Sequence, residues 1–237
     1  MYVANHFSMS DAEIHQLLGA GGAADLVTAH EHGLVATFLP FVFDPDAGPR
    51  GSLIAHVARN NRQWIDPVIG EAMVIVHGPE HYISPRWMPS FAEHAQVVPT
   101  WNYLTVHAYG RLVAHDDAAW TEAAVRRLTA VHEQAAGREP YSVDRVPADY
   151  IERQLRAIVG TEVELTRVEA KAKMSQNKMP DDVAGVVDGL RTEVGGEHAG
   201  LEGVAGGRQG HHGPDRHGAT VPTAVPPSRP APHVSGT

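Results

Sequence analysis

The chain has 237 residues, of which 43% are hydrophobic, and its 19 basic and 28 acidic side chains give a formal charge of −9. This charge argues against a general nucleic-acid coat protein, because sequence-independent binding to phosphates requires clustered positive charge. A chain of this length and composition can bury a full hydrophobic core. It contains no cysteine, which excludes disulfides, thiolate metal sites and cysteine nucleophiles.

No run of the sequence reaches the roughly 18 apolar residues of a membrane-spanning helix, and the first residues lack the pattern of a signal peptide. We therefore predict a cytoplasmic protein without membrane contact. From residue 195 onward the sequence is rich in glycine and proline and nearly free of large apolar side chains, so burial cannot offset the entropy of ordering it. We predict one folded domain over residues 1–194 and a disordered tail over 195–237.

The first predicted element is a helix over residues 11–19, because Ser10 and Glu13 form a capping-box pattern at its start. A hairpin follows, with strands over 25–29 and 34–40 around a polar turn. Alternating and β-branched residues predict further strands, and turns at 45–51 and 78–79 separate several of them. These strands cover residues 41–43, 52–57, 72–77, 81–84 and 101–114.

Helical spacing of apolar residues predicts helices over 118–136 and 149–159. A last strand over 161–177 and a short helix after Pro180 complete the folded part. Several short strands followed by helices and a returning strand indicate an α+β fold, a split antiparallel β-barrel with peripheral helices. A doubly wound nucleotide fold is disfavoured, since the glycine-rich stretch 19–24 follows a helix instead of a strand.

The segment 163–177 alternates apolar and polar residues with the period of a strand, so Lys171, Lys173 and Ser175 share one predicted face. Two ammonium groups and a hydroxyl in line suit a phosphate ester, because lysine provides a point charge and serine a hydrogen bond. A solvated strand face explains the same pattern, so this segment alone leaves both interpretations open.

A second polar cluster leaves the strand predicted at 52–57 and contains His56, Arg59, Asn60 and Arg62. Arginine binds phosphate or carboxylate bidentately, while the histidine and the asparagine can orient such a group. The cluster is a candidate anion site, and an ordinary surface turn is the alternative.

A third cluster enters the strand predicted at 101–114. Trp101 and Tyr103 fall on one face and Asn102 on the other, which suits stacking and hydrogen bonding to a planar heteroaromatic ligand. Core aromatics at a barrel rim explain Trp101 equally well. The sequence contains no motif typical of a metal site or of a serine nucleophile, so we predict no metal and assign no catalytic residue.

Six segments in consistent order resemble the FMN-binding negative transcriptional regulator family of the PaiB type. They are MYVANHFSM (1–9), GSLIAHVARNNRQW (51–64), VIVHGPEHYISPRW (74–87), VPTWNYLTVHAYGRL (98–112), DYIERQLRAIVG (149–160) and KMSQNK (173–178). The resemblance extends to about residue 190. The chain departs from the family pattern at Ala55, where glycine is usual, and at Ala170 and Ala172, where a glycine and an aromatic residue are common.

This resemblance implies a split barrel related to flavin reductases and pyridoxamine-phosphate-oxidase-like proteins, and a homodimer with FMN at the subunit interface. It also implies repression of protease-production and sporulation genes. Carried over by position, the ligand-contacting residues are His56, Arg59, Asn60, Thr100, Trp101, Asn102, Lys173, Ser175, Gln176 and Asn177. In this hypothesis Lys173, Ser175 and Arg59 hold the FMN phosphate, while Trp101 and Asn102 contact the isoalloxazine ring.

The alternative function is a flavin-dependent oxidoreductase or a haem-handling enzyme on the same barrel. Enzyme status stays open, because no hydride-donor site is recognisable and a fold does not imply a function. Contact with DNA, directly or through a partner, also stays open, since the sequence shows neither a helix-turn-helix nor a basic stripe.

Overall fold

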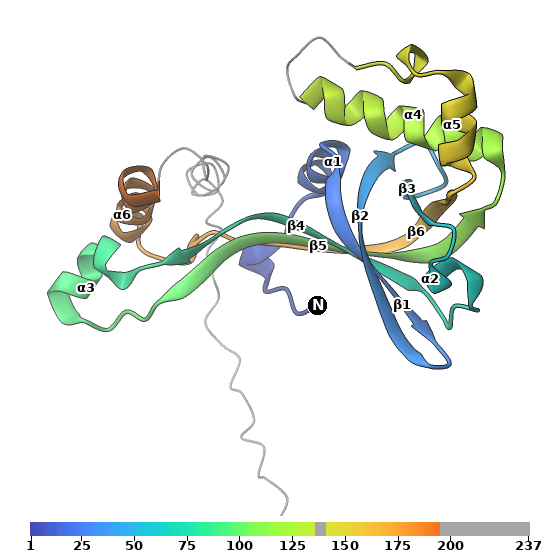
Figure 1. Ribbon diagram of the computed structural model, residues 1–237. Helices are drawn as coiled ribbons and strands as arrows, with labels where there is room; N and C mark the ends of the chain where they lie inside the picture. Colours follow the sequence, from blue (N-terminus) through green and yellow to red (C-terminus); the bar gives the residue numbers. More distant parts are fainter. Residues whose placement is uncertain (136–140, 195–237) are drawn as a thin grey trace, which may run out of the picture.

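The computed structural model describes residues 1–135 and 141–194 (Figure 1). The predicted tail over 195–237 lies outside the described residues. The strands are β1 (Gly22–His30), β2 (Gly33–Asp44), β3 (Ser52–Ala58), β4 (Ala72–Ile83), β5 (Thr100–His115) and β6 (Ile158–Lys173). The helices are α1 (Asp11–Gly19), α2 (Arg62–Ile65), α3 (Pro89–His94), α4 (Ala118–Ala135), α5 (Ala148–Leu155) and α6 (Pro180–Gly189). Shorter helical turns lie at Asn5–Phe7, Pro85–Trp87, Val143–Arg145 and Leu190–Val194.

Six antiparallel strands close into a barrel in the order β1-β2-β3-β6-β5-β4. β1 and β2 form the predicted hairpin, in which His30 pairs with Gly33. Gly33 has a φ of 114°, a conformation that glycine adopts without steric cost. The long strand β6 pairs with β3 at its start and with β5 along most of its length. The predicted antiparallel barrel with helices outside is confirmed.

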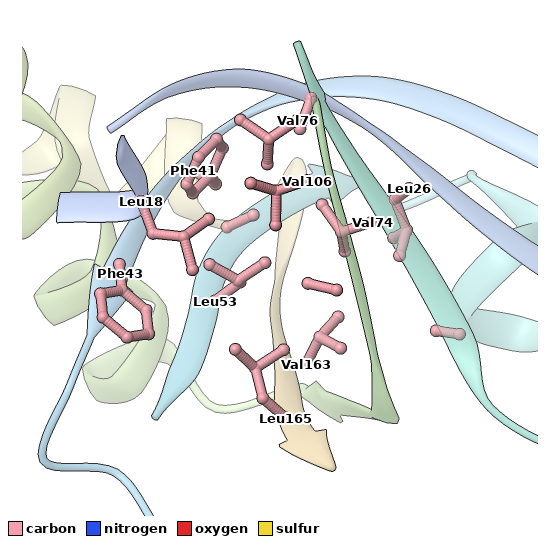
Figure 2. Close-up of a cluster of buried hydrophobic side chains, with 14 of the residues drawn as sticks. Leu18, Leu26, Phe41, Phe43, Leu53, Val74, Val76, Val106, Val163 and Leu165 are labelled. Carbon is pink, nitrogen blue, oxygen red and sulfur yellow. The ribbon is translucent and has the colours of Figure 1, made fainter. Parts of the chain in front are cut away.

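The barrel interior is filled by side chains that alternate along each strand. Figure 2 shows them converging on the axis, among them Leu26, Phe41, Leu53, Val74 and Val106, each at most 2% exposed. The space left among the core side chains measures about 10 Å³. A flavin-sized ligand therefore has no room inside the barrel and must bind on its outer surface.

The helices at the barrel are placed by caps and by apolar faces. The capping box of α1 is present as predicted, since the Ser10 amide donates to the Glu13 carboxylate at 2.7 Å and the Ser10 side chain accepts from the Glu13 amide. Helix α4 covers β2 and β3, where Val42 and Ile54 pack with Leu128. Within the described residues, no helix combines the length and apolar character needed to cross a membrane.

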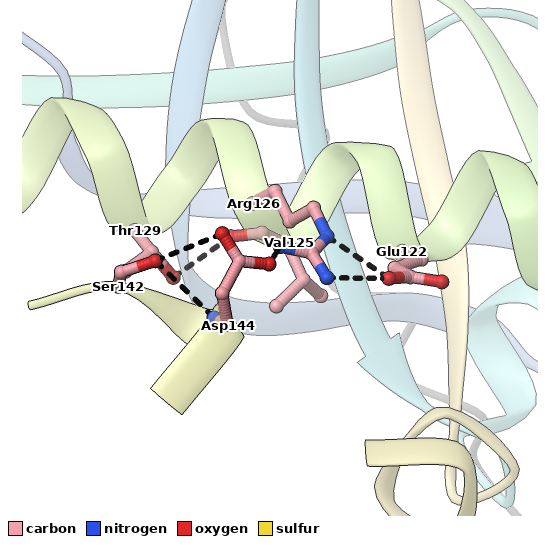
Figure 3. A network of polar contacts seen from close by, with 6 residues as sticks. All are labelled: Glu122, Val125, Arg126, Thr129, Ser142 and Asp144. Atoms are coloured by element: carbon pink, nitrogen blue, oxygen red, sulfur yellow. Dashed lines mark hydrogen bonds and ion pairs between the residues drawn. The ribbon is translucent and has the colours of Figure 1, made fainter. Parts of the chain in front are cut away.

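A polar network joins α4 to the segment before α5 (Figure 3). Arg126 donates to Glu122 at 2.9 Å on its own helix and to Asp144 at 2.7 Å on the neighbouring turn. The Ser142 side chain caps this turn by accepting from the Asp144 amide. The hydrogen bond from Arg126 is the main reason why the pKa of Asp144 is lowered. Because the network is exposed, we assign it a role in placing α5 and only a small one in stability.

Beyond Val76, β4 no longer pairs with β1, and the sheet continues as a three-stranded extension of β4, β5 and β6. We define the arm as this extension, residues 77–83, 100–105 and 171–173, together with the segments 84–94 and 174–194, which contain α3 and α6 at its end (Figure 1). The arm has its own buried cluster, which consists of Ile83, Met88, Leu104, Ala172, Met174, Val186 and Leu190. One face of the arm is therefore packed against α6 and the turns beside it. This packing fixes the strands and so fixes the positions of the side chains on the opposite face.

The predicted break between strands 72–77 and 81–84 is wrong. These residues form one strand, β4, in which the register shifts between His77 and Glu80 as a bulge. Gly78 permits the close contact with β5 at this point, because a Cβ there would lie 2.7 Å from the Leu104 Cβ.

Two predicted ends also differ from the structure. The helix predicted over 149–159 ends at Leu155, because Ile158 already begins β6 and β-branched residues favour strands. The strand predicted over 161–177 ends at Lys173, because Ser175 adopts a φ of 60°, which is incompatible with an extended chain.

Candidate functional site

The arm brings two of the predicted clusters together. Tyr103 of β5 pairs with Lys173 of β6, so residues 100–102 lie beside the end of β6. The Lys173 ammonium donates to the Thr100 hydroxyl and, at 2.8 Å, to the Trp101 carbonyl. Ser175 donates to the side-chain oxygen of Asn102 at 2.9 Å. We call these residues the arm site: Thr100, Trp101, Asn102, Tyr103, Lys171, Lys173 and Ser175.

The arm concentrates positive charge. All three lysines of the chain, Lys171, Lys173 and Lys178, lie within this short segment. Burial lowers the pKa of Lys173, and the charges of the other two lysines lower it further. The ammonium groups of Lys171 and Lys173 lie 5.5 and 5.9 Å from the ring centroid of Tyr103, so both are on the same side of the sheet.

Among the residues that the structure describes, no carboxylate pairs with the ammonium groups of Lys171 and Lys173. Glu169, the acidic residue that precedes Lys171 on the same strand, is already paired with the Met1 amino group and with Arg167. The hydrogen bond from the Met1 amino group has the largest effect in lowering the pKa of Glu169. Across residues 1–135 and 141–194, no acidic side chain forms an ion pair with Lys171 or Lys173. The site is therefore suited to an anionic ligand.

A buried amide adds a hydrogen-bond donor. Asn102 is 0% exposed, and its side-chain nitrogen has no partner among the described residues. A buried donor without a hydrogen-bond partner lowers the stability of the folded protein by about 1–3 kcal/mol, and a bound acceptor would remove this penalty. Gln176 fixes the neighbouring turn, since its side chain accepts from the Met174 amide at 2.6 Å and donates to the His6 carbonyl at 2.9 Å. Gln176 is therefore a support of the site.

An open aromatic surface completes the arm site. Trp101 is 51% exposed and meets the edge of Tyr82 at a centroid distance of 6.4 Å. A half-exposed indole suits stacking on a flat ring, while the Asn102 side chain lies on the opposite, packed face of β5. Asn177 is exposed in the turn that follows β6.

The remaining predicted residues lie at the far end of the barrel. Arg59 follows β3 and donates to the carbonyls of Arg156 at 2.7 Å and Ile158 at 3.1 Å, and it pairs with Asp116 at 2.8 Å. These contacts tie the turn after β3 to the start of β6. They use much of the guanidinium's hydrogen-bonding capacity, which gives Arg59 a structural role in this chain.

His56 and Asn60 lie in the same region. His56 falls on the outer face of β3, the face on which Ile54 packs against α4. Burial lowers the pKa of His56, and its Nδ1 is buried without a hydrogen-bond partner in the described part of the chain. Asn60 is exposed in the turn after β3.

The two groups of predicted residues are far apart within one chain. Ala58 pairs with Ile158 at the start of β6, and Tyr103 pairs with Lys173 at its end. With a rise of about 3.3 Å per residue, the path along β6 between them is about 50 Å, and Figure 1 shows the arm on the opposite side of the molecule from β3 and the start of β6. A phosphate shared by Arg59 and Lys173 therefore requires two copies of the chain.

A separate cavity of about 660 Å³ lies beside the loop before β3 and shares no residue with the predicted site. Glu162 and Glu164 line it, and Arg111 on the same wall is already paired with Glu164 at 2.6 Å. Its two carboxylates are balanced by two arginines, Arg50 and Arg111, so the cavity has no excess of positive charge for a phosphate dianion. The arm site is the better candidate for an anionic ligand.

Comparison with known families decides the assignment. A family model described as "Putative FMN-binding domain" matches residues 1–167. The chain belongs to this FMN-binding family. The prediction of FMN as the cofactor is thereby confirmed at the level of the family. The matched span includes His56 and Asn102 and ends before Lys171. The assignment of the lysines to the site therefore rests on their positions in the structure and not on the family match.

Relatives of this family member come from bacteria and fungi. A Bacillus subtilis protein named "Protease synthase and sporulation protein PAI 2" is 28% identical over 199 residues, which cover 81% of this chain and 90% of the relative. An uncharacterized Aspergillus fumigatus protein is 29% identical over 206 residues, covering 68% and 79%. Among solved structures, the flavocytochrome Anf3 from Azotobacter vinelandii matches with a TM-score of 0.50 at 14% identity, covering 72% of each chain, which supports the fold alone.

The arm site of this FMN-binding family member fits FMN chemically. The phosphate dianion matches Lys171 and Lys173, which have no acidic partner in the described part of the chain, and the buried Asn102 nitrogen can donate to an acceptor such as a flavin carbonyl or a ribityl oxygen. The exposed face of Trp101 suits the isoalloxazine ring. When bound, FMN supplies redox chemistry or acts as a sensed ligand, and this chain supplies binding and orientation.

Sequence reasoning placed Tyr103 on the same face as Trp101 but missed its contact with the lysines, and it gave Phe7 no role. Tyr103 lies under both ammonium groups, and the Phe7 ring centroid is 5.7 Å from the Lys171 ammonium. The segment MYVANHFSM carried the family resemblance, but its distance from the KMSQNK segment in the sequence gave no indication that the two meet.

Proposed function

We propose that this FMN-binding family member is a flavin-binding regulatory protein whose arm site holds the FMN phosphate. The observation that carries the proposal is that Lys171 and Lys173 have no acidic partner among residues 1–135 and 141–194 and lie at the strand segment that carries the unpaired amide of Asn102. Protein purified after growth in flavin-rich medium should show a flavin absorption spectrum, and FMN fluorescence should be quenched on titration. Absence of both signals would remove the proposal.

The proposed contacts follow the geometry of the arm. Lys173 and Ser175 bind the phosphate, with Thr100 holding the Lys173 ammonium in place. Trp101 and Asn102 contact the isoalloxazine ring. Gln176 holds the turn, and Asn177 extends the polar rim.

We also propose a homodimer with FMN at its interface, in which His56, Arg59 and Asn60 of one copy approach the arm site of the other. The separation of these residues along β6 supports this arrangement, because one chain cannot join them. The outer face of β2 supports it too, since Leu34 is 78% and Phe38 70% exposed, and apolar surface of this kind favours association.

A mixing experiment tests the composite site. Asn60→Asp places a carboxylate where the partner's phosphate is proposed to lie, and Lys173→Ala removes the cation on the arm, so each homodimer should bind FMN weakly. Random exchange of subunits makes half of the dimers mixed, and each mixed dimer has one intact site, so about one quarter of the sites should recover. Titration with FMN counts the sites. Wild-type affinity of Asn60→Asp, with no recovery on mixing, would place the ligand within one chain.

The pH dependence of binding follows from the lowered pKa of Lys173. Deprotonation removes the positive charge, so FMN affinity should fall as the pH rises, and the fall should begin below the ordinary lysine value of 10.5. The phosphate carries its full charge above about pH 7, because its second pKa is about 6. Riboflavin, which lacks the phosphate, should show no such loss over the same pH range. An FMN affinity that is constant through alkaline pH would contradict a role for Lys173.

The regulatory role rests on the Bacillus relative, whose name refers to protease synthesis and sporulation. Repression of genes in that class is the form that the resemblance implies. The exposed arginines of α4 and α5 are paired with acidic neighbours, for example Arg126 with Glu122 and Arg153 with Asp149, which argues for DNA contact through a partner or a local patch. A gel shift with the promoter of the protein's own gene, with and without FMN, tests this role.

The alternative is a flavin-dependent oxidoreductase or a haem-handling enzyme on the same barrel. NAD(P)H consumption that depends on added FMN would favour the enzyme over the regulator. A promoter shift that responds to FMN without such consumption would favour the regulator.

A further inference from the structure

The segment Asn5–Phe7 and the following Ser8 lie against the arm, and the proposed function leaves them without a role. Ser8 forms an antiparallel bridge with Lys171, and the His6 carbonyl accepts from the Gln176 side chain. Figure 1 shows this dark-blue segment beside the long strands of the arm. Residues more than 160 positions apart in the sequence are thus joined at the arm site.

Phe7 is the side chain of this segment that reaches the lysines. Its ring centroid lies 5.7 Å from the Lys171 ammonium, while the Tyr103 ring lies 5.5 Å from the same group. Both distances fall within the range of cation–π attraction, which is about 6 Å. The Lys171 ammonium is therefore held by two aromatic rings that come from different parts of the chain.

This arrangement restricts a side chain that is otherwise flexible. A lysine on an exposed strand samples many rotamers, and ordering them opposes ligand binding. Phe7 is half-buried, so its ring is itself fixed, and the backbone bridge at Ser8 sets its position along β6. The Lys171 ammonium is thereby kept at the Tyr103 ring, where the Lys173 ammonium is held by Thr100 and the Trp101 carbonyl.

We propose that Phe7 is a positioning residue of the arm site: together with Tyr103 it fixes the Lys171 ammonium beside Lys173, so that a ligand phosphate meets two ordered cations. This inference rests on the proposed binding of FMN at the arm. It assigns a role to the N-terminal segment, which supplies a wall of the site without itself contacting the ligand.

The test uses the fact that the chain has only three lysines. Reductive methylation of the full-length, ligand-free protein, followed by peptide mass spectrometry, gives the reaction rate of each amine. Phe7→Leu keeps apolar bulk and removes one of the two cation–π contacts of Lys171, so Lys171 should react faster while Lys178 keeps its wild-type rate. FMN affinity should fall about two- to fivefold, as expected for one exposed cation–π contact, and riboflavin affinity should not change.

Two further variants control the test. Phe7→Tyr keeps the ring and should restore both the Lys171 rate and the FMN affinity. Phe91→Leu makes the same substitution at another partly exposed phenylalanine of the arm, in α3, and should leave both readouts at the wild-type level.

The outcomes separate the two claims. Unchanged Lys171 reactivity and FMN affinity in Phe7→Leu would overturn the inference, and so would an equal loss of FMN and riboflavin, which indicates general disruption of the arm. If wild-type protein binds no FMN while Lys171 still reacts faster in Phe7→Leu, the positioning of Lys171 is upheld and FMN is removed as the ligand.

Discussion

Replacing Lys173 with alanine is expected to weaken FMN binding about 10- to 150-fold and to leave riboflavin binding nearly unchanged. The ammonium is held by the Thr100 hydroxyl and the Trp101 carbonyl, and its charge is not offset by a carboxylate of the described residues. A charge-assisted hydrogen bond to phosphate contributes about 1.5–3 kcal/mol, which corresponds to that loss of affinity. Fluorescence titrations with the two flavins measure both values.

Arg153→Ala is the matched control for charge. Arg153 is an exposed cation of α5 paired with Asp149, and its removal changes the net charge as Lys173→Ala does without touching the arm. FMN affinity in this control should stay within about twofold of wild type. Equal losses for FMN and riboflavin in Lys173→Ala, or an unchanged FMN affinity, would show that the phosphate binds elsewhere.

The stability of Lys173→Ala provides a further check on the cause of the loss. Burial and two neighbouring lysines lower the pKa of Lys173, so the charged form is disfavoured in the folded protein. Removing it should therefore leave the melting temperature of the FMN-free protein close to the wild-type value. A lost affinity accompanied by a preserved melting temperature separates a binding role from a folding role.

Phe41→Ala is expected to lower the free energy of unfolding by about 3–5 kcal/mol, the largest effect on stability that we expect from a single side chain. Phe41 is 0% exposed and lies among the core side chains inside the barrel (Figure 2). Truncation loses the transfer free energy of the ring and leaves a cavity that closely packed neighbours cannot fill. Equilibrium denaturation of the FMN-free protein measures the change.

Phe38→Ala is the control on the same strand. Phe38 is 70% exposed in a single chain, so its truncation should change the free energy of unfolding of the monomer, measured at a dilution that prevents association, by less than about 1 kcal/mol. A comparable loss in both variants would mean that the inward and outward faces of β2 are not those described here.

Local chemistry explains why parts of the fold were predictable. Ser10 and Glu13 predict the start of α1, because a capping box joins residues only three positions apart and can therefore be recognised in the sequence. Period-2 alternation correctly placed Trp101 and Asn102 on opposite faces of the strand, since the two faces follow from backbone geometry alone, but it did not show which face is buried.

Long-range pairing explains what the sequence could not show. Whether Arg59 lies near Lys173 depends on how β6 pairs with β3 and β5. The register of these strand pairs cannot be predicted from the sequence of either strand alone. The contact of Phe7 with Lys171 is equally non-local. The bulge after His77 was missed because a glycine and a proline in succession are typical of turns.

Protection of the lysines by ligand tests the central claim most directly. The chain offers only three lysine side chains, all on the arm, so an amine-reactive reagent reports on this site with little background. Saturating FMN should slow the labelling of Lys171 and Lys173 strongly, whereas saturating riboflavin should leave Lys173 reactive. Equal labelling of Lys173 with and without bound FMN would contradict the proposal that the arm binds the FMN phosphate.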